Sequence, residues 1–137
     1  MHPFIKDLIE KVYCRIQVSP IAGVGVFAIR DIPEGIDPMQ EQRDFEFGEV
    51  SKAEIIDNPE IPAAVKKLVV DMCPERDGVF DIPPTTLNEI GVSYYLNHSK
   101  TPNMGERDGN FVTLRPIKAG EELLVDYGTY GAENLEP

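Results

Sequence analysis

The sequence predicts a single, mainly β domain that is interrupted by a helical insert. The chain has 137 residues with 12 prolines and 11 glycines, a content that favours many turns and short elements over a long-helix bundle. Runs rich in β-forming residues lie towards both ends of the chain, and the segment between them has helical spacing of its apolar residues. A chain of this length commonly forms one domain, 1–137.

The N-terminal part predicts one short helix and two strands. Residues 3–11 place apolar side chains at helical spacing, as in an amphipathic cap. Residues 12–19 alternate apolar and polar side chains, as in a half-buried strand, and residues 23–31 form a second β-rich run. Pro33 and Gly35 then suit a turn.

The middle of the chain predicts helices. Ser51 and Glu54 have the spacing of a capping box, in which each side chain accepts a hydrogen bond from the other residue's backbone amide. Further along, residues 63–73 place apolar side chains on one helical face: Val65, Leu68, Val69 and Met72. This segment therefore reads as a helical insert between two β regions.

The C-terminal part predicts short strands within 93–99, 111–115 and 122–127, followed by a polar tail. One pattern, R-x-I-x-x-G, occurs twice, at residues 30–35 and 115–120. Each copy follows a β-rich run and ends in a glycine, which predicts two similar turns between strands.

Charge and composition exclude several classes of protein. The chain has 24 acidic and 13 basic residues, a net charge of −11, and it lacks the Lys/Arg cluster that direct nucleic-acid binding requires. The charge would attract a cationic partner, although solubility alone also explains it. No apolar run has the length of a membrane span and no export signal is evident, so a cytoplasmic location is expected, with nuclear location or signal-less export left open.

No metal site is expected. The residues that ligate zinc are scattered singletons, whereas a structural zinc site needs about four ligands at short spacing. These residues are His2, Cys14, Cys73 and His98. The two cysteines are expected to be reduced thiols.

Three segments carry possible chemistry. The first, residues 22–27, contains Gly23 and Gly25, which either let a ligand approach the backbone or form a bulge. The second, residues 94–103, is dense in short polar side chains that need partners if they are buried. The third is the run 120–127, Gly-Glu-Glu-Leu-Leu-Val-Asp-Tyr.

Taken in order, G-x-G, YLNHSKTPN and GEELLVDY resemble the SET domain of protein-lysine methyltransferases. The resemblance extends from Ala22 to Tyr127, about three-quarters of the chain. It implies a β-clip-like fold of several small sheets with a C-terminal pseudo-knot. It also implies an N-terminal β part with the Gly-x-Gly (11–36), a variable helical insert (37–90), a C-terminal catalytic part (91–128) and a tail (129–137).

The cysteine-rich segments that flank the domain in many members are missing, so this form resembles the small bacterial or viral members. In the members that have these cysteine-rich segments, the segments supply a wall over the lysine channel. Here the tail or a second subunit would supply it, which leaves a homodimer open.

The resemblance implies S-adenosylmethionine as cofactor and assigns roles to particular residues. The backbone around Ala22, Gly23, Val24 and Gly25 would receive its methionine end. Asn97 would hold its amino group, and His98 would contact the adenine through the backbone. A bulge without a ligand and a structural histidine are the alternative interpretations.

Tyr127 is the predicted catalytic residue, and its alternative is a core aromatic on a strand. Three further tyrosines are candidates to line a lysine channel, because their rings attract ammonium groups: Tyr94, Tyr95 and Tyr130. Glu121 and Glu122 are interpreted as a turn and a solvated face rather than a catalytic pair, and the resemblance gives them a structural part.

The sequence therefore predicts a protein-lysine N-methyltransferase that uses S-adenosylmethionine and acts on a lysine-containing, basic protein or peptide. The main alternative is a non-catalytic module of the same fold that binds a peptide or small ligand. A third possibility is methylation of something other than a protein lysine.

Overall fold

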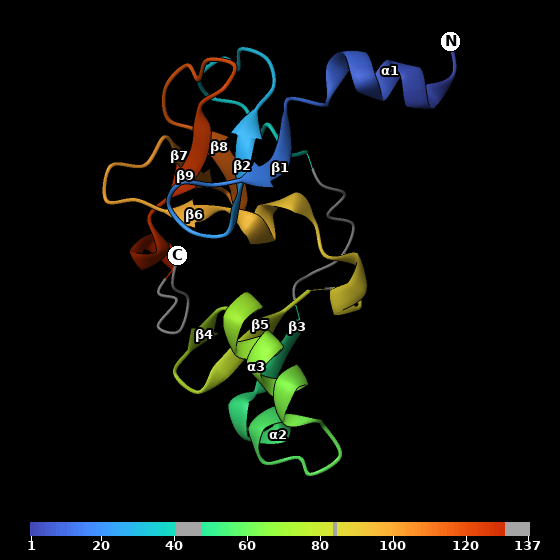
Figure 1. Ribbon diagram of the computed structural model, residues 1–137, viewed down its shortest axis with the longest axis vertical. Helices are drawn as coiled ribbons and strands as arrows, with labels where there is room; N and C mark the ends of the chain where they lie inside the picture. Colours follow the sequence, from blue (N-terminus) through green and yellow to red (C-terminus); the bar gives the residue numbers. More distant parts are fainter. Residues whose placement is uncertain (41–47, 84, 131–137) are drawn as a thin grey trace. The chain divides into compact units, whose positions relative to one another are not determined.

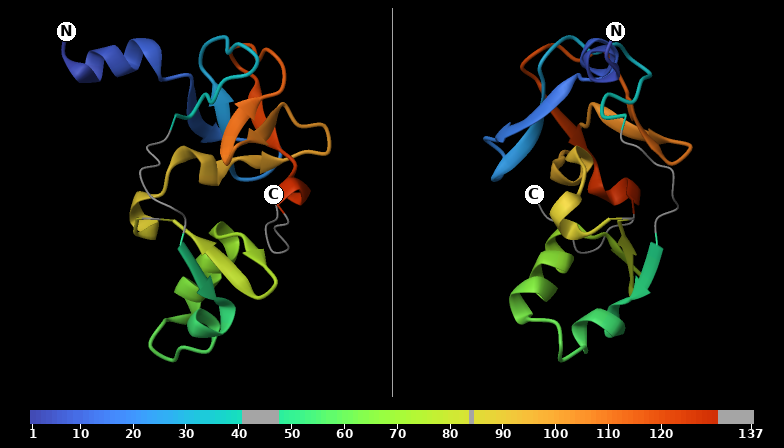
Figure 2. Two further views of the ribbon diagram at one scale, coloured as in Figure 1. Left: turned by 180° about the vertical axis from the view of Figure 1, so that it is seen from behind. Right: turned by 90° about the vertical axis from the view of Figure 1, so that its right-hand side faces the viewer.

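The computed structural model describes residues 1–40, 48–83 and 85–130, with the side chain of Tyr130 left out. It contains two compact units (Figures 1 and 2). The first unit comprises Met1–Gln42 and Gly91–Asp126, and the second comprises Arg43–Ile90 and Tyr127–Glu136. Short strands in several small sheets, with few helices, confirm the predicted fold class. In the described residues, no helix has the length and apolar character to cross a membrane.

The first unit begins with helix α1 (Pro3–Glu10), as the sequence predicts. The His2 side chain caps it by accepting a hydrogen bond from the Phe4 amide at 3.0 Å. The helix does not cap the core, however, because none of its residues is buried, and Phe4 is 64% exposed.

A four-stranded sheet forms the centre of the first unit. Its order is β1 (Cys14–Val18), β2 (Val24–Ala28), β9 (Glu122–Val125) and β6 (Asn97–His98). β2 pairs antiparallel with β1 and β9, and β6 pairs parallel with β9. This inner position of β2 buries residues 25–28. The predicted strand at 93–99 is only partly confirmed, since residues Val92–Tyr95 form a 3-10 helix, η2, before β6.

The hairpin of β7 (Met104–Arg107) and β8 (Asn110–Thr113) completes the strands of this unit. Its two-residue turn, Asp108-Gly109, has φ values of 52° and 80°. Positive φ at both positions fits the right-handed twist of the strands. The second strand of this hairpin was predicted within 111–115, whereas the first was not predicted.

The repeated R-x-I-x-x-G pattern has a structural explanation. Its two isoleucines, Ile32 and Ile117, form an antiparallel bridge with reciprocal backbone hydrogen bonds of 2.7 and 2.9 Å, and each is 1% exposed. The closing glycines, Gly35 and Gly120, have φ values of 83° and 94°, a region that favours glycine. The two copies therefore pair with each other in the core of the first unit.

The second unit combines helices with a three-stranded sheet. Its sheet has the order β3 (Gly48–Ser51), β5 (Val79–Ile82), β4 (Glu75–Arg76). Its helices are α2 (Lys52–Ile56), α3 (Ala63–Met72), and the 3-10 helices η1 (Leu87–Glu89) and η3 (Tyr127–Tyr130). The Ser51–Glu54 capping box is confirmed. The strands of the insert were not predicted.

The core of the second unit consists of Val69, Cys73 and Phe80. The predicted apolar face of α3 is therefore only partly right. Val69 is buried, whereas Val65 and Leu68 are each 44% exposed, because Phe80 of β5 packs with the face that carries Val69 and Cys73.

Cys73 should be chemically inert in the folded protein. Burial, reinforced by the negative charge of Asp81, raises the pKa of its thiol and so lowers the fraction of reactive thiolate. In a Cys14→Ser background at neutral pH, we expect maleimide to label Cys73 far more slowly in buffer than in urea. Equal labelling rates under the two conditions would contradict the buried position.

Candidate functional site

The connection between β1 and β2 is a tight loop shaped by Ser19. The Ser19 amide donates to the Gly23 carbonyl at 2.9 Å, and the Ser19 hydroxyl accepts from the Ile21 amide at 3.0 Å. Gly23 has a φ of 46°, which side-chain-bearing residues rarely adopt. The loop is thus held by its own backbone, and the open space around Gly23 leaves its outer side accessible.

Asn97, at the start of β6, joins this loop to the rest of the sheet. Its side chain is buried, with the residue 6% exposed. Its amide nitrogen donates to the carbonyls of Ala22 at 3.3 Å and Val24 at 3.1 Å, and to the Glu122 carboxylate at 2.9 Å. The structure therefore brings together the Gly-x-Gly and Asn-His segments, which the sequence analysis placed in one site.

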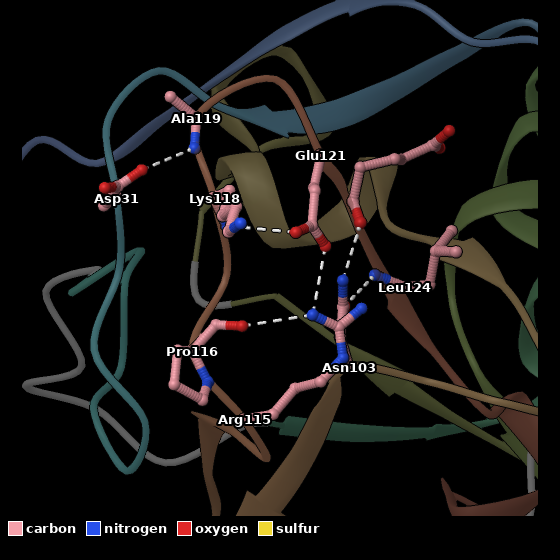
Figure 3. Close-up of polar contacts among 9 residues, drawn as sticks. Asp31, Asn103, Arg115, Pro116, Lys118, Ala119, Glu121 and Leu124 are labelled. Atoms are coloured by element: carbon pink, nitrogen blue, oxygen red, sulfur yellow. Dashed lines mark hydrogen bonds and ion pairs between the residues drawn. The ribbon is translucent and has the colours of Figure 1, made fainter.

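Glu122 corrects one sequence-based interpretation. Its carboxylate is not on a solvated face, because it also accepts hydrogen bonds from the Ser19 hydroxyl at 2.8 and 3.0 Å. Glu121 does lie at the surface, where it pairs with Arg115 at 3.0 Å and accepts from the Lys118 amide at 3.2 Å (Figure 3). Successive side chains of an extended chain point to opposite faces, which separates the two glutamates.

Gly25 leaves room for this network. A Cβ atom at this position would overlap the Glu122 carboxylate and lie 3.0 Å from the Asn97 amide nitrogen. The lack of a side chain at Gly25 is therefore explained by packing within the protein. Its predicted contact with a cofactor stays a prediction.

Several polar groups beside the loop remain available. The carbonyls of Ala22, Gly23 and Val24 all accept hydrogen bonds from the protein. By contrast, the amides of Ala22 and Gly23 and the side-chain oxygen of Asn97 have no partner within the described part of the chain. The site thus offers two donors and one acceptor to a ligand.

His98 lies next to Asn97 in β6, opposite Val125 of β9. Its Nδ1 lies 3.7 Å from the Asp126 carboxylate, and the Lys100 ammonium is 3.9 Å from the same oxygen. Both distances exceed a hydrogen bond. The predicted contact of His98 with adenine stays a prediction.

Asn103 is a structural residue that the sequence analysis did not single out. It is 3% exposed, donates to the Glu122 carbonyl at 2.8 Å and accepts from the Leu124 amide at 2.8 Å (Figure 3). Its own carbonyl accepts from the Leu114 amide. One buried side chain therefore holds β9 in place. The sequence signal that could have identified Asn103 is its position in the polar block 94–103.

The four predicted tyrosines are distributed over both units. Tyr94 and Tyr95 end η2 of the first unit, where they are half-buried, and η2 packs near β2. Tyr127 and Tyr130 are the first and last residues of η3 in the second unit. Tyr127 is half-buried. The catalytic and channel roles of these residues stay predictions.

Comparisons with known proteins identify the family. The SET domain model matches residues 23–128, so the chain belongs to the SET domain family. This membership supports lysine methyltransferase activity in general terms. A search of curated proteins finds no significant match.

Solved structures share the fold. A proposed histone methyltransferase of Plasmodium falciparum is 25% identical, with a TM-score of 0.48, over 86% of this chain and 95% of that chain. The apo form of the ctPRC2 complex with mutations in Ezh2 is 23% identical, with a TM-score of 0.53. A humanized Chaetomium thermophilum Polycomb Repressive Complex 2 bound to an inhibitor is 21% identical, with a TM-score of 0.50. This chain spans 15% of each of the latter two.

Within the described residues, no group of three or more His, Cys, Asp or Glu side chains is arranged to hold a metal ion.

The hydrogen bonds of Glu121 make its contribution to stability depend on pH. The hydrogen bond from the Lys118 amide, with a smaller contribution from Arg115, lowers the pKa of Glu121 from its ordinary 4.5, against the effect of desolvation. Its stabilising contribution is therefore present above about pH 4.5 and is lost as the pH falls through the lower folded-state pKa.

In urea unfolding at pH 7, Glu121→Gln should cost about 0.5 kcal/mol, as for an exposed ion pair. The difference from the wild type should vanish in strong acid. Glu106→Gln, at an exposed position of β7, serves as control. A cost that is independent of pH would contradict a stabilising role for the ionised Glu121 carboxylate.

Proposed function

We propose that this chain transfers a methyl group from S-adenosylmethionine to the side-chain amine of a lysine in a protein. The observation that carries the proposal is the arrangement around the Gly23 loop. There the Asn97 side-chain nitrogen donates its hydrogen bonds to the protein, and the side-chain oxygen is left to accept from a ligand. Family membership supports the same activity.

The groups at this loop fit the methionine end of the cofactor. That end carries a cationic amino group and an anionic carboxylate. The Asn97 side-chain oxygen is an acceptor for the amino group, and the amides of Ala22 and Gly23 are donors for the carboxylate. When bound, the cofactor supplies a methyl group on a positively charged sulfur. By resemblance, His98 contacts the adenine through its backbone.

The second requirement is a neutral lysine amine. With an ordinary pKa of about 10.4, only about one lysine in 2,500 is neutral at pH 7. The Tyr127 hydroxyl orients the amine and its lone pair, a positioning effect. Tyr94, Tyr95 and Tyr130 are candidates for the channel, where their rings hold an ammonium group by cation–π contact.

The net charge of −11 supports a basic protein or peptide as substrate, because it attracts cations and repels nucleic acid. A cytoplasmic location is part of the proposal. The alternative is a non-catalytic module that binds a peptide or small ligand on the same fold.

Cofactor binding can be tested directly. S-adenosylmethionine should raise the melting temperature of the protein, because a ligand of the folded state stabilises it by mass action. Asn97→Ala should weaken binding by about tenfold to a hundredfold, through loss of a hydrogen bond to a charged group. Calorimetry on wild type, Asn97→Ala and the exposed-residue control Asn110→Ala provides the measurement. Absence of binding at millimolar cofactor would favour the non-catalytic alternative.

Tyr127→Phe separates catalysis from folding. The change removes one oxygen and keeps the ring, so it should cost at most about 1 kcal/mol of stability. If the hydroxyl positions the amine, single-turnover methylation at saturating cofactor should slow by about a hundredfold or more while cofactor binding persists.

Tyr13→Phe is the matched control for this variant, since Tyr13 contacts Arg30 through its ring rather than its hydroxyl. A near-normal rate for Tyr127→Phe would refute the assignment and turn attention to the other three tyrosines. A large fall in melting temperature would show that the hydroxyl is structural.

A further inference from the structure

We propose that Glu122 is a positioning residue for cofactor binding. Its carboxylate fixes the orientation of the Asn97 amide, and Gly25 lacks a side chain because that carboxylate occupies the space. The proposal rests on the proposed function, since it concerns the methionine end of the same site. It assigns a role to a residue that the sequence analysis placed on a solvated face.

An asparagine amide can face a ligand with either of two ends of nearly equal shape, one a donor and one an acceptor. At Asn97 the neighbouring groups determine which end of the side-chain amide faces the ligand. The nitrogen lies within hydrogen-bond distance of three acceptors: the Ala22 carbonyl, the Val24 carbonyl and the Glu122 carboxylate. A flipped amide would turn its oxygen toward all three. The neighbours therefore keep the acceptor end available for the cationic amino group.

Among these three acceptors, Glu122 forms the strongest hydrogen bond with the Asn97 side-chain nitrogen. Its contact is the shortest, at 2.9 Å compared with 3.1 and 3.3 Å for the carbonyls. Hydrogen bonds to an ionised group are also about twice as strong as neutral ones. The Ser19 hydroxyl donates to the same carboxylate and accepts from the Ile21 amide, so Glu122 couples the orientation of Asn97 to the shape of the loop.

Gly25 gives an independent observation. Its φ is not positive, so alanine is compatible with the backbone conformation there. A Cβ atom would nevertheless overlap the Glu122 carboxylate. The carboxylate is the far end of a flexible side chain and would move aside, away from Asn97 and Ser19. Gly25→Ala should therefore weaken the contact between Glu122 and Asn97, and its Cβ atom would in addition lie 3.0 Å from the Asn97 amide nitrogen.

A merely structural role for Glu122 is distinguishable from positioning. The backbone of β9 is held by Asn103 and by its two neighbouring strands rather than by the Glu122 side chain. Loss of a positioning role should weaken only the binding of the amino and carboxylate groups at the methionine end of the ligand. The informative comparison is therefore between S-adenosylhomocysteine, which has the amino and carboxylate groups, and 5′-methylthioadenosine, which lacks both.

Calorimetry with these two ligands tests the proposal. Glu122→Ala should raise the Kd for S-adenosylhomocysteine by about tenfold or more and leave that for 5′-methylthioadenosine within about twofold. Gly25→Ala should also raise the Kd for S-adenosylhomocysteine, because its Cβ atom would overlap the Glu122 carboxylate and lie 3.0 Å from the Asn97 amide nitrogen. Ser19→Ala and Glu122→Gln should give smaller losses. Glu121→Ala is the matched control and should bind as the wild type does.

Wild-type affinity of Glu122→Ala for S-adenosylhomocysteine would overturn the proposal. Equal losses for the two ligands would do the same. The result expected for the free protein is independent of any ligand. Amide hydrogen exchange at Ser19 and Ile21, whose amides are hydrogen-bonded within the loop, should be faster in Glu122→Ala and Gly25→Ala and unchanged in Glu121→Ala.

This exchange measurement separates the two proposals. A wild type that binds neither ligand refutes the proposed function, while unchanged exchange in Glu122→Ala refutes the positioning role. If Glu122→Ala does not fold, Glu122→Gln and Ser19→Ala keep the side-chain volumes closer to the original and are judged by the same two measurements.

Discussion

The arrangement of the first unit depends on the position of β9. This strand pairs antiparallel with β2 on one side and parallel with β6 on the other. Asn103 fixes it there through two hydrogen bonds of 2.8 Å to its backbone. Because β9 lies between them, the N-terminal hairpin and the Asn-His segment belong to one sheet, although they are distant in sequence. Removing β9 would separate the two halves of the candidate site.

The same strand brings the Glu122 side chain to the site. Ser19, Glu122 and Asn97 form a continuous set of hydrogen bonds that joins a loop and two strands. A buried polar network of this kind is favourable only when its members are satisfied, because unpaired polar groups in a low-dielectric environment are costly. In this network the side-chain nitrogen of Asn97 donates to protein acceptors, whereas its side-chain oxygen accepts no hydrogen bond from the described residues. That asymmetry is the observation on which the proposed cofactor site rests.

The second unit has a core of its own, built around Phe80 and the face of α3 that carries Val69 and Cys73. Its strands β4 and β5 are joined by Asp77-Gly78, with φ values of 52° and 76°. The insert is therefore a small α+β unit with an antiparallel sheet rather than a pair of helices.

Local patterns in the sequence determined the helices, the β1–β2 hairpin, the Ser51 capping box and the family. Both Asp-Gly turns were also present as signals for the hairpins that were missed. Only the tertiary structure decided that Glu122 is a partner of Asn97, that Gly25 makes room for it, and that the two isoleucines of the repeated pattern pair with each other. Periodicity reports which face of an element is apolar, whereas these contacts join residues from distant segments. Their geometry is fixed by strand pairing and packing, which no local pattern encodes.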